Sequence, residues 1–286
     1  MDRAYAASPV KTMEETAMKV SDRPEVSHSR VTEPAVPVAC GRHYLYAVVE
    51  ASEPRWYPSI GIEGNEVYTI TEGRMAAVVS GLASPKIRPQ RAHLAAHQAV
   101  LKCLMADTTP LPMAFGTIAA SPDAIRRILV HNRHALEEQF RRVAGKVEMG
   151  LRVAWDVPNI FEYFVNTHAE LRLARDRLVG VRHEFTQEEK IELGRMFDRL
   201  LNDDREDHIR KVQRVLDPVC VEFKANQCRN EREVMNVVCL VRRDAQEEFS
   251  AGVFAAAKLF DNNFAFDYSG PWAPHNFVEL ELDLEL

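Results

Sequence analysis

The 286-residue sequence lacks paired cysteines, long apolar runs and an excess of one sign of charge. No apolar run approaches the ~20 residues of a membrane span, and the N-terminus has no apolar signal core, so we expect a soluble protein. A net charge of −6, from 42 acids and 36 bases, gives no attraction to nucleic acid or to a membrane surface. The cysteines are odd in number, widely spaced and free of C-x-x-C pairs, which favours a reducing cytoplasm. They are Cys40, Cys103, Cys220, Cys228 and Cys239.

Signatures of catalysis and cofactor binding are also missing. The chain contains no G-x-x-x-x-G-K-[ST], no G-x-G-x-x-G and no G-x-S-x-G. Paired carboxylates such as Asp203-Asp204 and Glu247-Glu248 lie in charged helical segments, where solvation explains them better than acid-base catalysis. We therefore predict no catalytic residue and no cofactor, and we expect the protein not to be an enzyme.

Two histidines have the spacing of a metal site. His93 and His97 lie four residues apart on a predicted helix, as two imidazoles that share a metal would. Position 94 is Leu94, where a metalloprotease would have glutamate, and no third ligand is evident. We interpret both as solvated or hydrogen-bonded histidines and predict no metal site.

What is present is an ordinary globular composition, with 46% hydrophobic and 27% charged residues. The length favours two domains. Residues 1–41 have mixed charges, four prolines and hardly any periodic apolar pattern, so we expect a disordered extension that is dispensable for folding. The predicted organisation is therefore an extension at 1–41, an N-terminal α+β domain at 42–146 and a C-terminal domain at 147–286.

The N-terminal domain is expected to mix strands and helices. A glycine-ended connection, Thr71-Glu72-Gly73, predicts a hairpin, and Ser121-Pro122-Asp123 is typical of a helix start. The expected elements are a strand at 43–49, hairpin strands at 66–70 and 74–80, a helix at 89–106, an extended edge segment at 109–117 and a helix at 121–144.

The C-terminal domain is predicted to be a ferredoxin-like β-α-β-β-α-β sheet with an inserted helical hairpin at about 158–217. Thr186 and Glu189 form a capping box that restarts the hairpin after a break, and Asp244 is expected to cap the next helix. The expected strands lie at 147–155, 219–225, 234–243 and from Phe264, with the last helix at 244–259. Residues 278–286, V-E-L-E-L-D-L-E-L, alternate strictly and predict a further strand.

The most distinctive stretch is F-A-F-D-Y-S-G-P-W-A-P-H-N-F-V at 264–278. Its first half alternates as a strand with one aromatic face, and Ser269-Gly270-Pro271 predicts a turn. Trp272 then lies between two prolines on a stiffened loop. Two interpretations stay open, a loop that caps its own core and a binding site built around the tryptophan.

Two motifs resemble the gas vesicle protein F/L family, GvpF/GvpL. They are L-P-M-A-F-G-T at 111–117 and Y-S-G-P-W-A-P-H-N-F-V at 268–278. The similarity covers roughly 43–280. The chain departs from the family pattern at Ala273, where proline is usual, and at His275, where an aromatic is usual.

The resemblance implies two α+β domains and a non-catalytic accessory role in gas vesicle assembly, at the gas vesicle in the cytoplasm. The implied partner is the small hydrophobic shell protein, with or without other accessory proteins of the same assembly. We expect the partner-binding residues to be Tyr268, Gly270, Pro271, Trp272, Pro274, Asn276 and Phe277. The alternative from another class is a small-molecule enzyme or sensor with a cleft between the two domains.

Overall fold

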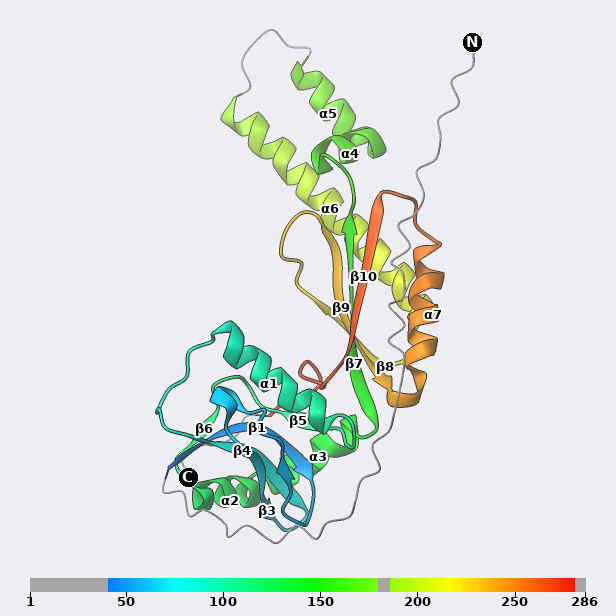
Figure 1. Ribbon diagram of the computed structural model, residues 1–286. Helices are drawn as coiled ribbons and strands as arrows, with labels where there is room; N and C mark the ends of the chain where they lie inside the picture. The colour runs from blue at the N-terminus through cyan, green and yellow to red at the C-terminus, as the bar shows by residue number, and fades with distance from the viewer. Residues whose placement is uncertain (1–40, 180–185, 281–286) are drawn as a thin grey trace, which may run out of the picture. The chain divides into compact units, whose positions relative to one another are not determined.

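The computed structural model describes residues 41–179 and 186–280, which form an α+β fold built on two antiparallel sheets (Figure 1). The expected α+β class is confirmed. Among the helices of these two ranges, none is both long and apolar enough to cross a membrane. The extension expected at 1–41 lies outside the described residues, apart from Gly41.

The N-terminal sheet has the strand order β2-β3-β4-β1-β5, and the short β6 also pairs with β1. β5 is an edge strand, as expected for a segment with two prolines, because proline lacks the N–H that a central strand needs. The strands are β1 (Arg42–Glu50), β2 (Trp56–Tyr57), β3 (Val67–Glu72), β4 (Met75–Leu82), β5 (Leu111–Pro112) and β6 (Ile118–Ala119), with a 3-10 helix η1 (Ile62–Gly64) before β3.

Helices cover both faces of the N-terminal sheet. Tyr44 of β1 packs with Leu101 and Leu104 of the first helix, whereas Leu45 and Val48 belong to the cluster on the opposite face. Residues 44–49 of β1 are buried on both sides of the sheet, which suits their unbroken apolar sequence with no polar alternation. The helices are α1 (Arg91–Leu104) on the first face, and α2 (Pro122–His131) and α3 (Arg133–Val143) on the second.

Two expectations for this region were wrong in detail. Glu72 pairs with Met75, so the hairpin turn is Gly73-Arg74 and β3 extends through the residues expected to form the connection. Gly73 has φ +63°, a conformation that glycine adopts without the steric cost of a Cβ. The helix expected at 121–144 is two helices, because Asn132 leaves helical geometry and its side-chain amide donates to the Ile128 carbonyl at 2.9 Å.

The C-terminal sheet has the order β10-β7-β9-β8, and every neighbouring pair is antiparallel. Helices separate β7 from β8 and β9 from β10, and β8 and β9 follow each other directly. The elements are β7 (Lys146–Trp155), α4 (Ile160–Thr167), α5 (Ala169–Val179), α6 (Gln187–Leu216), β8 (Cys220–Asn226), β9 (Glu233–Arg242), η2 (Arg243–Ala245), α7 (Gln246–Ala257) and β10 (Phe264–Trp272).

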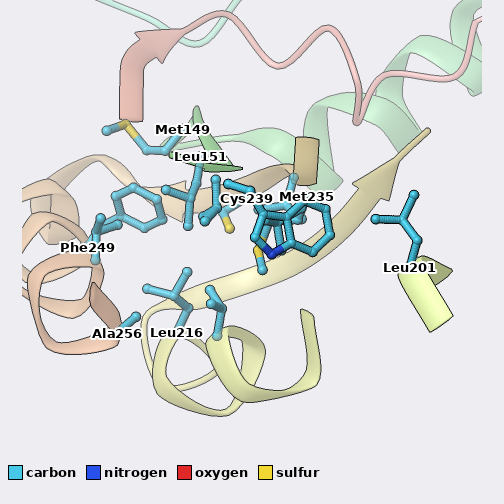
Figure 2. Packing of buried hydrophobic residues seen from close by; sticks show 14 of the residues in the cluster. Met149, Leu151, Leu201, Leu216, Met235, Cys239, Phe249 and Ala256 are labelled. Atoms are coloured by element: carbon cyan, nitrogen blue, oxygen red, sulfur yellow. The ribbon is translucent and has the colours of Figure 1, made fainter. Parts of the chain in front are cut away.

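Helices α6 and α7 cover one face of the C-terminal sheet. Figure 2 shows Leu151 and Cys239 of the sheet in one cluster with Leu216 of α6 and Phe249 of α7. All four side chains are almost fully buried. This cluster forms the hydrophobic core of the C-terminal region.

The helical insert begins and restarts largely as predicted. The Thr186 side chain accepts from the Glu189 N–H and the Glu189 carboxylate accepts from the Thr186 N–H, which confirms the capping box. The first part is broken at His168, which has extended backbone geometry, so α4 and α5 are separate helices. Asp244 does not cap α7, because it lies in η2 and pairs with Arg242 at 3.1 Å.

The strand expected at 278–286 is not observed in its described part. Residues 278–280 are not in a strand, and 281–286 lie outside the described residues. The main chain of Glu279 instead donates to the Gln139 side chain of α3 at 3.3 Å. Val278 and Leu280 pack against the cluster under α2 and α3.

Candidate functional site

The aromatic stretch singled out from the sequence forms strand β10 and the turn that follows it. Phe264 and Phe266 pack on the C-terminal core, and both rings contact Phe260 edge to face. Tyr268 is 40% exposed, and its hydroxyl forms a 2.8 Å hydrogen bond with Ser250 of α7. The predicted strand with one aromatic face is confirmed.

The turn expected at Ser269-Gly270-Pro271 is wrong, because β10 continues through these residues to Trp272. A bulge between Ser269 and Trp272 accommodates the glycine and the proline. Gly270 has φ +130°, and a Cβ on it would come within 2.8 Å of the Met149 sulfur and 2.9 Å of the Glu148 carbonyl. Only glycine therefore fits at this point, where β10 lies close against its neighbour β7.

Trp272 projects at the end of β10 with 45% of its surface exposed. Its indole N–H donates to the Ser269 hydroxyl at 3.2 Å. Pro271 beside it is also exposed. The tryptophan is thus accessible, and a bond to its own strand restrains its ring.

The chain turns sharply after Trp272 and buries three of the next five residues, whereas His275 and Asn276 are exposed. Ala273 lies in the cluster beneath α1, and Pro274 is buried as well. The N–H groups of Phe277 and Val278 both donate to the Pro274 carbonyl at 3.1 Å. This turn is folded against the core, as the capping interpretation predicted.

Asn276 satisfies a buried carboxylate. Its backbone N–H donates to Glu148 Oε2 at 2.8 Å and its side-chain amide to Oε1 at 2.6 Å. Lys224 Nζ donates to the Asn276 carbonyl at 3.0 Å. Burial raises the pKa of Glu148, and the Asn276 hydrogen bonds and the Lys224 charge oppose that shift. Asn276 therefore stabilises the buried carboxylate of Glu148 on β7.

Phe277 is fully buried and lies in the same cluster as Leu240 of β9 and Phe140 of α3. The ammonium of Lys224 lies 5.3 Å from the centre of the Phe277 ring. Lys224 also forms a 2.9 Å ion pair with Glu279. Phe277 thus packs the end of the described chain against elements of both sheets.

The histidines considered as a metal pair have separate surroundings. His93 Nδ1 forms a 2.9 Å hydrogen bond with the Arg88 carbonyl, and buried His97 forms one with the Tyr44 hydroxyl at 2.9 Å. Burial lowers the pKa of His97 to about 4, and nearby His275 adds a smaller effect. The part of the chain that the structure describes contains no group of three or more metal-ligating side chains.

A groove of about 520 Å³ lies beside Trp272. Gly270, Pro271 and Trp272 line it, whereas the other predicted residues, Tyr268, Pro274, Asn276 and Phe277, do not. The remaining lining residues come from α1 and its end, from β7, from η2, from the start of α7 and from the residue after β10. They are Ala95, Gln98, Ala99, Leu101, Lys102, Met105, Ala106, Val147, Arg243, Gln246 and Ala273.

The sequence did not point to the residues of α1 as part of this site. The available signal is modest, namely that Ala95, Ala99 and Lys102 share one helix face and are all exposed. Arg243 was also missed; its guanidinium donates to the carbonyl oxygens of Met105 and Thr108, the latter at 2.7 Å. These bonds fix a cation at the end of α1.

The lining of the groove is largely apolar and basic. Among the described residues that line it there is no carboxylate, histidine, thiol or hydroxyl side chain. Apolar surface and two cations, Lys102 and Arg243, are what the site offers a ligand.

Comparison with known proteins gives consistent matches over most of the chain. The model of the family described as gas vesicle synthesis protein GvpL/GvpF matches residues 42–279. Gas vesicle protein F of Dolichospermum flosaquae is 23% identical over 241 residues, which is 83% of this chain and 98% of that protein. Gas vesicle protein F of Streptomyces sp. (strain CB03234) is 26% identical over 241 residues, 82% of this chain and 99% of that protein.

Solved structures show the same fold. The crystal structure of the gas vesicle protein GvpF from Anabaena sp. PCC7120 matches with a TM-score of 0.73 at 22% identity, over 84% of this chain and 99% of that chain. That of GvpF from Microcystis aeruginosa matches with a TM-score of 0.72 at 21% identity, over 84% and 99%.

Proposed function

Because the chain belongs to the gas vesicle synthesis protein GvpL/GvpF family, we propose that it acts in gas vesicle assembly by binding the small hydrophobic shell protein. It would act as an adaptor, a nucleator or a minor wall component, at the gas vesicle. A shell that repels water needs subunits with large apolar surfaces, and these aggregate when free. A binder that covers such a surface during assembly solves that problem.

The observation that carries this proposal is the exposure of Trp272 next to a largely apolar groove. Tryptophan is among the residues that contribute most to binding at protein interfaces. Its bond to Ser269 lowers the entropy that the ring loses on binding. We place the contact at Gly270, Pro271 and Trp272, and we assign Pro274, Asn276 and Phe277 to supporting that surface.

Two features of the architecture belong to the same proposal. We assign 42–146 and 147–286 to two domains, each organised around its own sheet. We also assign the second to the ferredoxin-like group, because its strands follow the β-α-β-β-α-β order and lie in the sheet order β10-β7-β9-β8. The insert α4 to α6 enlarges its first crossover.

The test is capture of purified shell protein by the full chain and by Trp272→Ala. Losing an interfacial tryptophan commonly costs about 2 kcal/mol, so capture should weaken roughly thirtyfold. Trp56→Ala is the matched control, because Trp56 is 40% exposed but lies on β2 and does not line the groove. Both variants should unfold at the wild-type temperature.

Two results would contradict the proposal. Failure of the wild-type chain to capture shell protein would remove the proposed partner. Equal capture by wild type and Trp272→Ala, with both folded, would move the binding surface elsewhere on the chain. The small-molecule alternative has only the size of the groove in its favour.

A further inference from the structure

The α1 side of the groove has a surface suited to close packing. Ala95, Ala99 and Lys102 are spaced i, i+4, i+7 and are exposed along one face of the helix. From Ala95 to the end of α1 this face is about 14 Å long. Alanine side chains end at Cβ, so another backbone can approach this face closely, as at small-residue contacts between packed helices.

The strand side of the groove is a poor template for an added strand. β10 is an edge strand, and edges commonly recruit a partner strand through their free N–H and C=O groups. At the groove, however, Pro271 has no N–H, and the bulge between Ser269 and Trp272 interrupts the regular ladder. An occupant of this groove therefore gains little from main-chain pairing and must supply side-chain contacts.

The charges of the groove have one sign. Of the described residues that line it, Lys102 and Arg243 are basic and none is acidic. Hydrogen bonds to the carbonyls of Met105 and Thr108 hold Arg243 in place and leave further guanidinium N–H groups able to donate. Lys102 is exposed, and within the described ranges no ion pair engages it. Gln98 and Gln246 add neutral amide donors.

We propose that this groove binds one apolar α-helix of a partner polypeptide, about ten residues long, which places a carboxylate side chain at Lys102 and Arg243. The helix packs its apolar face between the alanines of α1 and the ring of Trp272. The inference rests on the proposed function, because it specifies which kind of shell-protein segment the site recognises. Charge complementarity selects an apolar helix that carries an acidic side chain at this position, and the small α1 residues admit its backbone.

The test uses two synthetic helical peptides as probes, each of about 16 residues and rich in leucine and alanine. One carries two glutamates at neighbouring turns and the other carries lysines at the same positions. Binding to the full chain is followed by fluorescence anisotropy of labelled peptide. We expect the glutamate peptide to bind about tenfold more tightly than the lysine peptide at low salt.

Variants distinguish binding in the groove from nonspecific binding of the peptides elsewhere on the protein. Lys102→Glu should reverse the preference between the two peptides. Ala99→Trp fills the groove from an exposed helix position and should abolish binding of the glutamate peptide, with an unchanged circular dichroism spectrum. Trp56→Ala should bind both peptides as the wild type does. Equal affinity for both peptides, or undiminished binding by folded Ala99→Trp, would overturn the inference.

The same variants distinguish this inference from the proposed function. Wild-type capture of shell protein that persists in Ala99→Trp would leave the proposed function standing and reject the groove as its site. Failure of the wild type to capture shell protein would reject the proposed function. A chain that still binds the glutamate peptide would then have a helix-binding groove for a different partner.

Discussion

Trp272 and Phe277 lie five residues apart in the sequence but have opposite surroundings. Trp272 is 45% exposed and lines a groove, whereas Phe277 is fully buried between elements of both sheets. Gly270 allows the strand to pass close to β7, and Asn276 satisfies a buried carboxylate. One compact motif therefore combines an exposed tryptophan, the surface that we propose for a partner, with buried residues that hold it in position.

This contrast explains why the composition of the stretch was ambiguous. The capping interpretation holds for Ala273 and Phe277, and the binding interpretation stays a prediction for the exposed Trp272. Burial is decided by what each side chain meets in the fold. Ala273 and Phe277 meet the cores beneath and above the N-terminal sheet, and Trp272 meets neither. Of the seven residues predicted to bind a partner, Gly270, Pro271 and Trp272 line the groove, and we keep these three as the proposed contact.

The largest expected effect on stability comes from truncating the buried Phe277. Phe277→Ala should destabilise the protein by about 3–5 kcal/mol, because it leaves a cavity in a cluster that includes Leu240 and Phe140. Urea unfolding measures the change. The matched control is Phe254→Ala, which removes the same side chain from a position that is 61% exposed and should cost about 0.5 kcal/mol or less. If Phe277→Ala lowers the free energy of unfolding by a similarly small amount, Phe277 does not stabilise the fold.

A smaller effect is expected at Asn276. Asn276→Ala removes the amide donor to Glu148 and should cost about 1–3 kcal/mol at neutral pH, because a buried carboxylate is left under-satisfied. Losing that donor raises the Glu148 pKa further above its unfolded value. As the pH falls through the raised folded-state pKa, Glu148 takes up a proton in the folded protein, so the deficit should shrink toward acidic pH.

A double variant checks the cause of that loss. Asn276→Ala combined with Glu148→Met removes the buried charge together with its partner, and it should be more stable than Asn276→Ala alone. Unfolding in urea at neutral and acidic pH gives the comparison. A deficit that stays constant with pH and persists in the double variant would exclude the carboxylate as its source.

Local sequence signals predicted the elements but not their long-range partners. The alternation of Phe264, Phe266 and Tyr268 predicted β10, and the capping box at Thr186 predicted the start of α6. Gly270-Pro271 suggested a turn, since these residues commonly break strands, and the sequence does not show that a bulge on an edge strand accommodates them. The break at Asn132 has only a weak local cause, so one long helix was the simpler prediction.

The candidate site was only partly predictable for the same reason. Trp272 stands out by its prolines, but the groove beside it depends on α1, which is far away in the chain. Glu148 is likewise separated from Asn276 by most of the C-terminal region, and no local pattern marks it as a buried acid. These relationships arise from packing between distant elements, which a single sequence does not specify directly.

The smallest effect on stability is expected at Trp272 itself. Trp272→Ala should change the free energy of unfolding by no more than about 0.5 kcal/mol, because nearly half of the side chain is exposed and its hydrogen-bond partner Ser269 is exposed to water. Urea unfolding alongside Phe277→Ala measures the two halves of the motif on one scale. If Trp272→Ala lowers the free energy of unfolding by more than about 2 kcal/mol, the tryptophan stabilises the fold as Phe277 does. The contrast between an exposed half and a stabilising half of the motif would then be wrong. A near-zero cost would show that the fold does not require Trp272, although this large aromatic side chain is in contact with water.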